Sequence, residues 1–166
     1  VHAHPPYGTS YAIAGIPLNK AIMPEAVIAL GEVPIAEYGT PSTEEIPDAV
    51  AKYLQCYDAV LLENHGALTY GPDLMTAYFK MESLEFYAKL MFISSQIGEP
   101  QVLNNGQVEK LIDIRKNMNL VGKHPALCNK EGKCKYSSNY IEEETSSEEE
   151  LIARIVKEVT ARVLSK

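Results

Sequence analysis

The chain is organised around the stretch Val1-His2-Ala3-His4-Pro5-Pro6-Tyr7-Gly8-Thr9. Successive side chains of an extended strand point to opposite faces, so His2 and His4 point to the same face with their imidazoles within reach of one ion. A His-x-His pair also occurs in strands that bind no metal, where each ring is hydrogen-bonded in the core or at the surface. The pair therefore predicts half of a metal site, and a further ligand must come from elsewhere in the fold.

A third histidine, His65, lies in the segment Glu63-Asn64-His65-Gly66. The apolar run Ala59-Val60-Leu61-Leu62 before it is typical of a buried strand, and the glycine after it favours a turn. We expect this turn to carry His65 to His2 and His4. Three imidazoles leave a coordination position free for water or a substrate oxygen, which is typical of a catalytic zinc site rather than a closed structural one.

Further motifs follow the histidine pair in a fixed order. They are Glu37-Tyr38-Gly39-Thr40-Pro41, then Glu63-Asn64-His65-Gly66-Ala67-Leu68, then a predicted helix with Met81-Glu82-x-x-Glu85. Together these motifs resemble the class II aldolase/adducin family. The resemblance covers residues 1 to about 98, and its most specific parts are His-x-His-Pro and Asn-His-Gly.

The resemblance implies a fold and an assembly. The fold is α/β, a three-layer α/β/α sandwich with a mainly antiparallel central sheet. The assembly is a homo-oligomer, a tetramer with active sites between neighbouring subunits. From the sequence patterns alone we would predict only a mixture of helices and strands.

The resemblance also implies a reaction and a cofactor. The reaction is that of a metal-dependent (class II) aldehyde-lyase: retro-aldol cleavage of a ketose 1-phosphate, such as L-fuculose 1-phosphate, to dihydroxyacetone phosphate and lactaldehyde. The cofactor is one divalent ion per subunit, Zn²⁺, with His2, His4 and His65 as its ligands. The ion stabilises negative charge where it develops on the substrate.

Three other functions fit the same scaffold. A sugar-phosphate 4-epimerase and a methylthioribulose-phosphate dehydratase share it, and an adducin-like structural protein has the domain without the metal ligands. The three histidines disfavour the structural protein. In similar proteins the phosphate-binding loops and an acidic proton-transfer residue precede His-x-His. We therefore expect this chain to be a fragment, with the equivalent loops and acidic residue upstream of Val1.

Composition narrows the class of protein. The 166 residues are 46% apolar, which is enough for one domain with a sizeable core. A net charge of −7 argues against a nucleic-acid partner or an anionic membrane surface. The apolar runs are too short for a transmembrane helix, so we expect a cytoplasmic protein with neither nucleic-acid nor membrane partners.

The cysteines are Cys56, Cys128 and Cys134. Their odd number and irregular spacing suggest free thiols in a reducing compartment more than a disulfide framework. A zinc knuckle of Cys128, Cys134 and His124 is an alternative, but its spacing fits no common zinc pattern.

Local signals predict several further elements. Thr9 or Ser10 can cap a short helix that Gly15 ends. Residues 27–36 mix aliphatic residues with glycine and proline, which indicates short, irregular strands. The pattern Ser42-x-x-Glu45 predicts a capping box at the start of a helix.

A long helix is predicted to start after Gly71-Pro72-Asp73 and to end at Gly98. Glu82 and Glu85 lie three residues apart on it and share a face. They could hydrogen-bond a ligand histidine, or they could be carboxylates that serve the fold alone.

Beyond the catalytic domain, which we assign to residues 1–128, the composition changes. Residues 129–147 are polar and read as a linker, and residues 148–166 as an amphipathic helix. Family aldolases transfer protons with tyrosines, one of them in a C-terminal tail, so the resemblance makes Tyr136 and Tyr140 the candidate catalytic residues.

The C-terminal helix has an apolar stripe that needs a surface to cover it, because so short a helix is marginal alone in water. The stripe consists of Leu151, Ile152, Ile155, Val156, Val159, Val163 and Leu164. A helix behind a polar linker is similar to the peptides that recruit enzymes into bacterial microcompartments. Residues 149–164 could therefore bind a microcompartment shell protein, or they could dock on their own oligomer.

Overall fold

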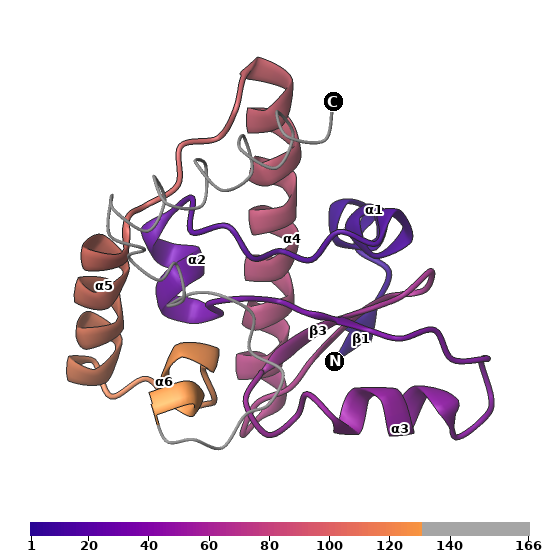
Figure 1. Ribbon diagram of the computed structural model, residues 1–166. Coiled ribbons are helices and arrows are strands. Elements are labelled where there is room, and N and C mark those ends of the chain that lie inside the picture. The colour runs from indigo at the N-terminus through magenta and orange to yellow at the C-terminus, as the bar shows by residue number, and fades with distance from the viewer. Residues whose placement is uncertain (131–166) are drawn as a thin grey trace, which may run out of the picture.

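The computed structural model describes residues 1–130, with side chains as far as Cys128 (Figure 1). Helices and strands alternate along this part of the chain. In order they are β1 (His2–Ala3), α1 (Pro6–Ala14), α2 (Pro24–Ala29), β2 (Ile35–Ala36), α3 (Glu45–Ala51), β3 (Ala59–Leu62), β4 (Gly66–Thr69), α4 (Leu74–Ile97), α5 (Asn105–Asn117) and α6 (Pro125–Lys130).

The strands form one sheet in the order β1-β4-β3-β2. β4 is antiparallel to both β1 and β3, whereas β2 is parallel to β3. Helix α3 connects β2 to β3, and a connection of this kind lets two strands run in the same direction. The sheet of the described residues is therefore mixed, and the prediction of a mainly antiparallel sheet is wrong.

β3 separates two apolar clusters. Ala59 and Leu61 pack with residues of α1, α2 and α4, whereas Val60 and Leu62 pack with residues of α3 and with Cys128 of α6. The alternation follows from the two-residue period of a strand. Helices thus lie on both faces of the described sheet, and the three-layer arrangement of a complete domain stays a prediction.

Helix α4 is the longest element and stands at the centre of Figure 1, with α1 beside it. The Asp73 side chain accepts a hydrogen bond from the backbone N–H of Thr76 at 2.8 Å and so caps its start. Gly98 follows its last residue, as predicted. Within the described residues, no helix combines the length and the apolar character that crossing a membrane requires.

Two other helices begin where the sequence did not predict. α1 starts at Pro6 rather than after Thr9 or Ser10, although Gly15 does end it with φ 68°. α2 occupies a part of residues 27–36 that was predicted as strand. Pro24 at its first position and an acidic residue in its first turn favour the helix, and the short apolar run that follows them cannot by itself distinguish helix from strand.

The predicted capping box of Ser42 and Glu45 is wrong. Ser42 has φ 68°, and the residue that caps α3, Glu44, makes no side-chain capping hydrogen bond. The Glu45 carboxylate instead accepts a hydrogen bond from the backbone N–H of Thr40 at 2.7 Å. It therefore ties the preceding turn to the helix.

Cys56 and Cys128 form a disulfide with their Cα atoms 5.4 Å apart. The expectation of free thiols is wrong for these two residues, and Cys134 lies outside the described residues. The partners are 72 residues apart, so only the packing of α6 beside the segment after α3 reveals the pair. The disulfide also removes Cys128 from the alternative zinc knuckle.

A buried polar region consists of Asp58, Lys80, Arg115 and His124. Lys80 donates to an Asp58 carboxylate oxygen at 2.5 Å, and that oxygen also accepts from the backbone N–H of Lys123 at 2.8 Å. Arg115 donates to the carbonyls of Ile28 and Ala29, where α2 ends. His124 Nε2 donates to the Val27 carbonyl at 2.7 Å.

Candidate metal centre

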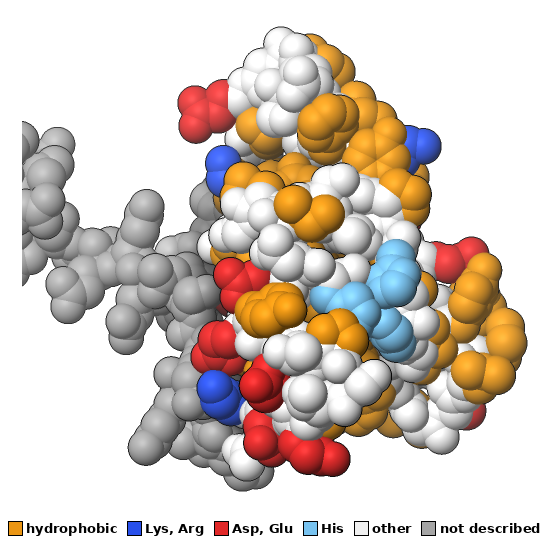
Figure 2. All heavy atoms as spheres, turned by 90° about the vertical axis from the view of Figure 1, so that its right-hand side faces the viewer, with side chains coloured by type: hydrophobic (Ala, Val, Ile, Leu, Met, Phe, Trp, Pro, Cys, Tyr) orange, Lys and Arg blue, Asp and Glu red, His pale blue; other side chains and the backbone are white. Residues whose placement is uncertain are grey.

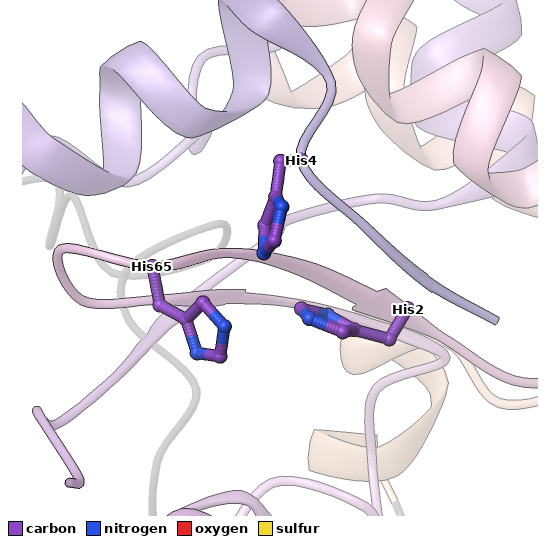
Figure 3. A group of neighbouring side chains, drawn as sticks. All are labelled: His2, His4 and His65. Atoms are coloured by element: carbon purple, nitrogen blue, oxygen red, sulfur yellow. The ribbon is translucent and has the colours of Figure 1, made fainter. Parts of the chain in front are cut away.

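The structure brings His2, His4 and His65 together at one edge of the sheet (Figure 3). His2 lies in β1, His4 follows it, and His65 lies in the turn between β3 and β4. Their rings point toward one another. The alternation of a strand, which predicted that His2 and His4 share a face, therefore holds in the structure.

The hairpin of β3 and β4 positions His65. Leu62 pairs with Gly66, so three residues form the turn. Asn64 adopts φ 55°, a left-handed conformation that asparagine tolerates better than most residues. β1 lies antiparallel to β4, with His2 opposite Leu68, and this register carries the start of the chain past the turn.

Gly66 allows the backbone and His4 to approach the hairpin closely. A Cβ atom at this position would lie 2.6 Å from the Ala3 carbonyl oxygen and 2.6 Å from His4 Cδ2. Any side chain here would force the Ala3 backbone or the His4 ring to shift. The sequence marked Gly66 only as a turn residue, so its role in seating His4 was not predicted.

The three imidazoles are close enough to share an ion. The ring centroids lie 4.9 Å apart for His2 and His4, 4.8 Å for His2 and His65, and 5.1 Å for His4 and His65. One nitrogen from each ring lies within 4.8 Å of those of the others. Ligands placed tetrahedrally at about 2.1 Å from zinc are about 3.4 Å apart, so the ring nitrogens would approach one another by at most about 1.4 Å around an ion.

The hydrogen bond of the His2 ring leaves its other nitrogen free to bind a metal ion. His2 Nδ1 lies 2.9 Å from the Ala67 carbonyl and donates to it, which directs the lone pair of Nε2 outward. His65 Nδ1 is buried and has no hydrogen-bond partner among the residues that the structure describes. The same holds for His124 Nδ1, so a buried nitrogen without a partner does not by itself mark a metal ligand.

The local electrostatics favour the neutral form of His65. Burial first, and then the positive charges that His2 and His4 carry when protonated, lower the pKa of His65 below its ordinary value. A neutral imidazole is the form that binds a metal. The site is also accessible, because Figure 2 shows the histidines as one continuous patch on the surface.

Residues 1–92 match the family described as Class II Aldolase and Adducin N-terminal domain. The chain belongs to the class II aldolase and adducin family. This match includes all three histidines and most of α4.

Individual relatives within this family differ in their reactions. The chain is 37% identical over 97 residues to a 3-oxo-tetronate 4-phosphate decarboxylase of Pectobacterium atrosepticum, covering 56% of this chain and 44% of the relative. It is 32% identical over 111 residues to a 5-deoxy-D-ribulose 1-phosphate aldolase of Bacillus thuringiensis serovar kurstaki, covering 67% and 52%. The structure of an L-fuculose 1-phosphate aldolase matches with a TM-score of 0.64 and 34% identity, covering 69% of this chain and 54% of that one. The chain thus spans about half the length of the proteins it matches.

The two carboxylates singled out on α4 have different partners. Glu85 accepts hydrogen bonds from the backbone N–H groups of Tyr7, at 3.0 Å, and Gly8, at 2.8 Å. Glu82 accepts from the Tyr78 hydroxyl at 2.9 Å on the exposed side of the helix. The hydrogen bonds of both therefore favour roles in the fold over direct contact with a ligand histidine.

The remaining predicted site residues lie beyond this region. Tyr136 and Tyr140, the candidate catalytic tyrosines of this class II aldolase and adducin family member, are outside the described residues. The linker and the C-terminal helix are outside them as well. The catalytic tyrosines, the linker and the C-terminal helix therefore stay predictions.

Proposed function

We propose that this protein is a metal-dependent lyase in which His2, His4 and His65 bind one divalent ion, Zn²⁺. The observation that carries the proposal is the convergence of three imidazoles, each with a ring nitrogen within 4.8 Å of those of the other two. Membership of the class II aldolase and adducin family supports it.

The chain's own residues would prepare the ligands. The Ala67 carbonyl holds the His2 ring in one tautomer, and burial lowers the pKa of His65, which favours its neutral form. When bound, the ion would supply Lewis-acid stabilisation of negative charge on the substrate's oxygens. Three protein ligands leave a position for that substrate.

We propose retro-aldol cleavage of a ketose 1-phosphate, either L-fuculose 1-phosphate or a close analogue, as the reaction. Support comes from the names of two matched proteins, which act on L-fuculose 1-phosphate and on 5-deoxy-D-ribulose 1-phosphate. With L-fuculose 1-phosphate the products would be dihydroxyacetone phosphate and lactaldehyde.

Decarboxylation of a 3-oxo acid phosphate is the second candidate, because the Pectobacterium relative carries that name at 37% identity. Both reactions break a carbon–carbon bond near a carbonyl group and leave negative charge beside it. The same electrostatic stabilisation would serve both. The difference between them must come from residues that contact the rest of the substrate.

A substrate panel tests the proposal. The full-length protein with Zn²⁺ is assayed for aldehyde release from ketose 1-phosphates and for CO₂ release from 3-oxo-tetronate 4-phosphate, with His65→Ala as the control. Aldehyde release that requires His65 supports the aldolase. Release of CO₂ alone favours the decarboxylase, and epimerised or dehydrated products would identify the two other enzymes. A metal-free protein with no turnover of any substrate would favour the adducin-like structural alternative.

The assembly is a further proposal. We propose a homotetramer of three-layer α/β/α domains, supported by membership of the family. Sedimentation of the full-length protein tests it, and a monomer with a working site would contradict it.

We also propose that the C-terminal helix recruits the protein to a microcompartment shell. The support is the apolar stripe of residues 149–164 and the polar linker before it in the sequence. Residues 147–166 fused to a fluorescent protein should co-purify with co-expressed shell, and Asp at Ile155 and Val159 should abolish this. A fusion that remains diffuse would favour docking on the parent oligomer.

A further inference from the structure

The carboxylate of Glu85 on α4 reaches Tyr7 and Gly8 at the start of α1, three and four residues after His4. We propose that Glu85 is a positioning residue for the metal centre: it anchors the backbone that sets the place of His4. The inference rests on the proposed metal function, because it concerns how the apoprotein holds a metal ligand.

Glu85 completes the hydrogen bonding at the start of α1. The first backbone N–H groups of a helix have no partner within it. Pro5 precedes this helix and Pro6 is its first residue, so neither has an N–H to satisfy. The next two N–H groups, of Tyr7 and Gly8, both donate to the Glu85 carboxylate, one to each oxygen. The following one, of Thr9, donates to the Pro5 carbonyl at 2.8 Å.

The charge of Glu85 strengthens this contact. An anion at a helix N-terminus is favoured by the helix dipole, and hydrogen bonds to a carboxylate are stronger than those between neutral groups. Pro5 offers no side-chain oxygen that could cap the helix in its place. The carboxylate therefore takes the part that a capping serine or aspartate usually plays, from a residue 77 positions along the chain.

Tyr7 and Gly8 also lie against neighbouring turns of α4. A Cβ atom on Gly8 would lie 2.7 Å from Leu84 Cδ2, so the two helices approach closely at this point. The Tyr7 ring lies 5.8 Å from the ring of Phe92, and Lys89 Nζ lies 5.7 Å from the centre of the Tyr7 ring. The start of α1 is thus fixed against α4 in more than one direction.

Two prolines transmit this position to His4. The pyrrolidine rings of Pro5 and Pro6 fix the backbone angle φ at both residues, and a residue that precedes proline is restricted to extended conformations. Few soft torsions therefore remain between His4 and the anchored N–H groups. Moving Tyr7 and Gly8 would move His4 with them.

Helix α4 is also tied to the hairpin that carries His65. The Thr69 hydroxyl, at the end of β4, donates to the Ala77 carbonyl of α4 at 2.7 Å. One rigid helix thus fixes both the hairpin and the segment after His4. The carboxylate at Glu85 links these two halves of the ligand set without touching the metal.

The experiment measures Zn²⁺ affinity and the absorption bands of bound Co²⁺ in the full-length protein, well below the unfolding temperature of every variant. The variants are Glu85→Ala, Glu85→Gln and the matched control Glu82→Gln, which alters a carboxylate one turn away. We expect Glu85→Ala to weaken binding by about 10- to 100-fold, the usual cost of losing a group that orients a metal ligand, and to shift the Co²⁺ bands. Glu85→Gln, which keeps one acceptor oxygen, should lie between it and wild type, and Glu82→Gln should match wild type.

Amide hydrogen exchange gives a readout that needs no metal. In the apoprotein, Tyr7 and Gly8 should lose protection in Glu85→Ala while the amides of β3 and β4 keep theirs. Unchanged affinity and Co²⁺ bands in both Glu85 variants would overturn the inference and leave the proposed metal function standing. A wild-type protein that binds neither ion would instead overturn the proposed function, and the inference with it.

Discussion

The buried polar region and the metal centre both gather polar side chains, but they satisfy them in different ways. In the buried polar region each charge has a partner within the chain: Lys80 has Asp58, and Arg115 has the carbonyls at the end of α2. In the metal centre the imidazoles of His2, His4 and His65 face one another instead, with one nitrogen of each ring within 4.8 Å of those of the others. Three imidazoles that converge near the surface have no opposite charge among themselves, so their partner would be a ligand from outside the chain, such as a metal ion.

His124 and His65 show the same contrast for one residue type. Burial lowers the pKa of both side chains. His124 lies deep in the interior and donates to the Val27 carbonyl, whereas His65 lies beside two other imidazoles. A shifted pKa alone therefore does not mark a functional histidine, and the neighbouring groups decide.

The largest effect is expected from Lys80→Ala. Removing one partner of a buried ion pair leaves the other charge unpaired, so the free energy of unfolding should fall by about 3–5 kcal/mol, measured by urea denaturation. The matched control is Lys116→Ala, because the Lys116–Asp113 pair is exposed and should contribute nothing measurable. Equal effects of the two substitutions would show that the buried polar region does not stabilise the fold.

A smaller effect is expected from acid. Burial lowers the pKa of His124 to about 4, so on acidification the unfolded state takes up this proton before the folded state does. Stability contributed by neutral His124 is present above about pH 6.5 and is lost as the pH falls toward about 4, by about 3 kcal/mol in all. The stability of His124→Gln should therefore decline less over this range than that of wild type, and parallel curves would contradict the assignment.

The smallest effect concerns the metal centre. In Gly66→Ala the added methyl group would collide with the Ala3 carbonyl and His4, and overpacking of this kind costs about 1–3 kcal/mol. Zn²⁺ affinity should fall by about 10- to 100-fold, as measured by competition with a chelating dye. Gly98→Ala is the control, since a Cβ there meets nothing within 4 Å and φ is 173°. If both variants bind zinc like wild type, the close approach of Gly66 does not position His4.

The sequence predicted what depends on local periodicity. The two-residue spacing of His2 and His4 placed them on one face, and the apolar run before His65 ended in a turn as expected. The long helix ended at Gly98 for the same local reasons. The order of the motifs then led to the hypothesis that the three histidines bind one ion, and their geometry supports it.

What the sequence did not predict depends on contacts between distant segments. The disulfide of Cys56 and Cys128 joins residues 72 positions apart, and spacing carries no sign of it. The carboxylate of Glu85 reaches Tyr7 and Gly8 from 78 and 77 positions away, so its hydrogen bonds could not be read from i to i+3 spacing. α2 was mistaken for strand because a short apolar run has no decisive period.

The most direct test of the metal centre is zinc X-ray absorption on the full-length protein, with the metal content measured on the same sample. The account predicts one zinc per chain with three imidazole nitrogens at about 2.0–2.1 Å, and two in His65→Ala. Sulfur ligands at about 2.3 Å, or a zinc environment that does not change when His65 is replaced, would contradict it.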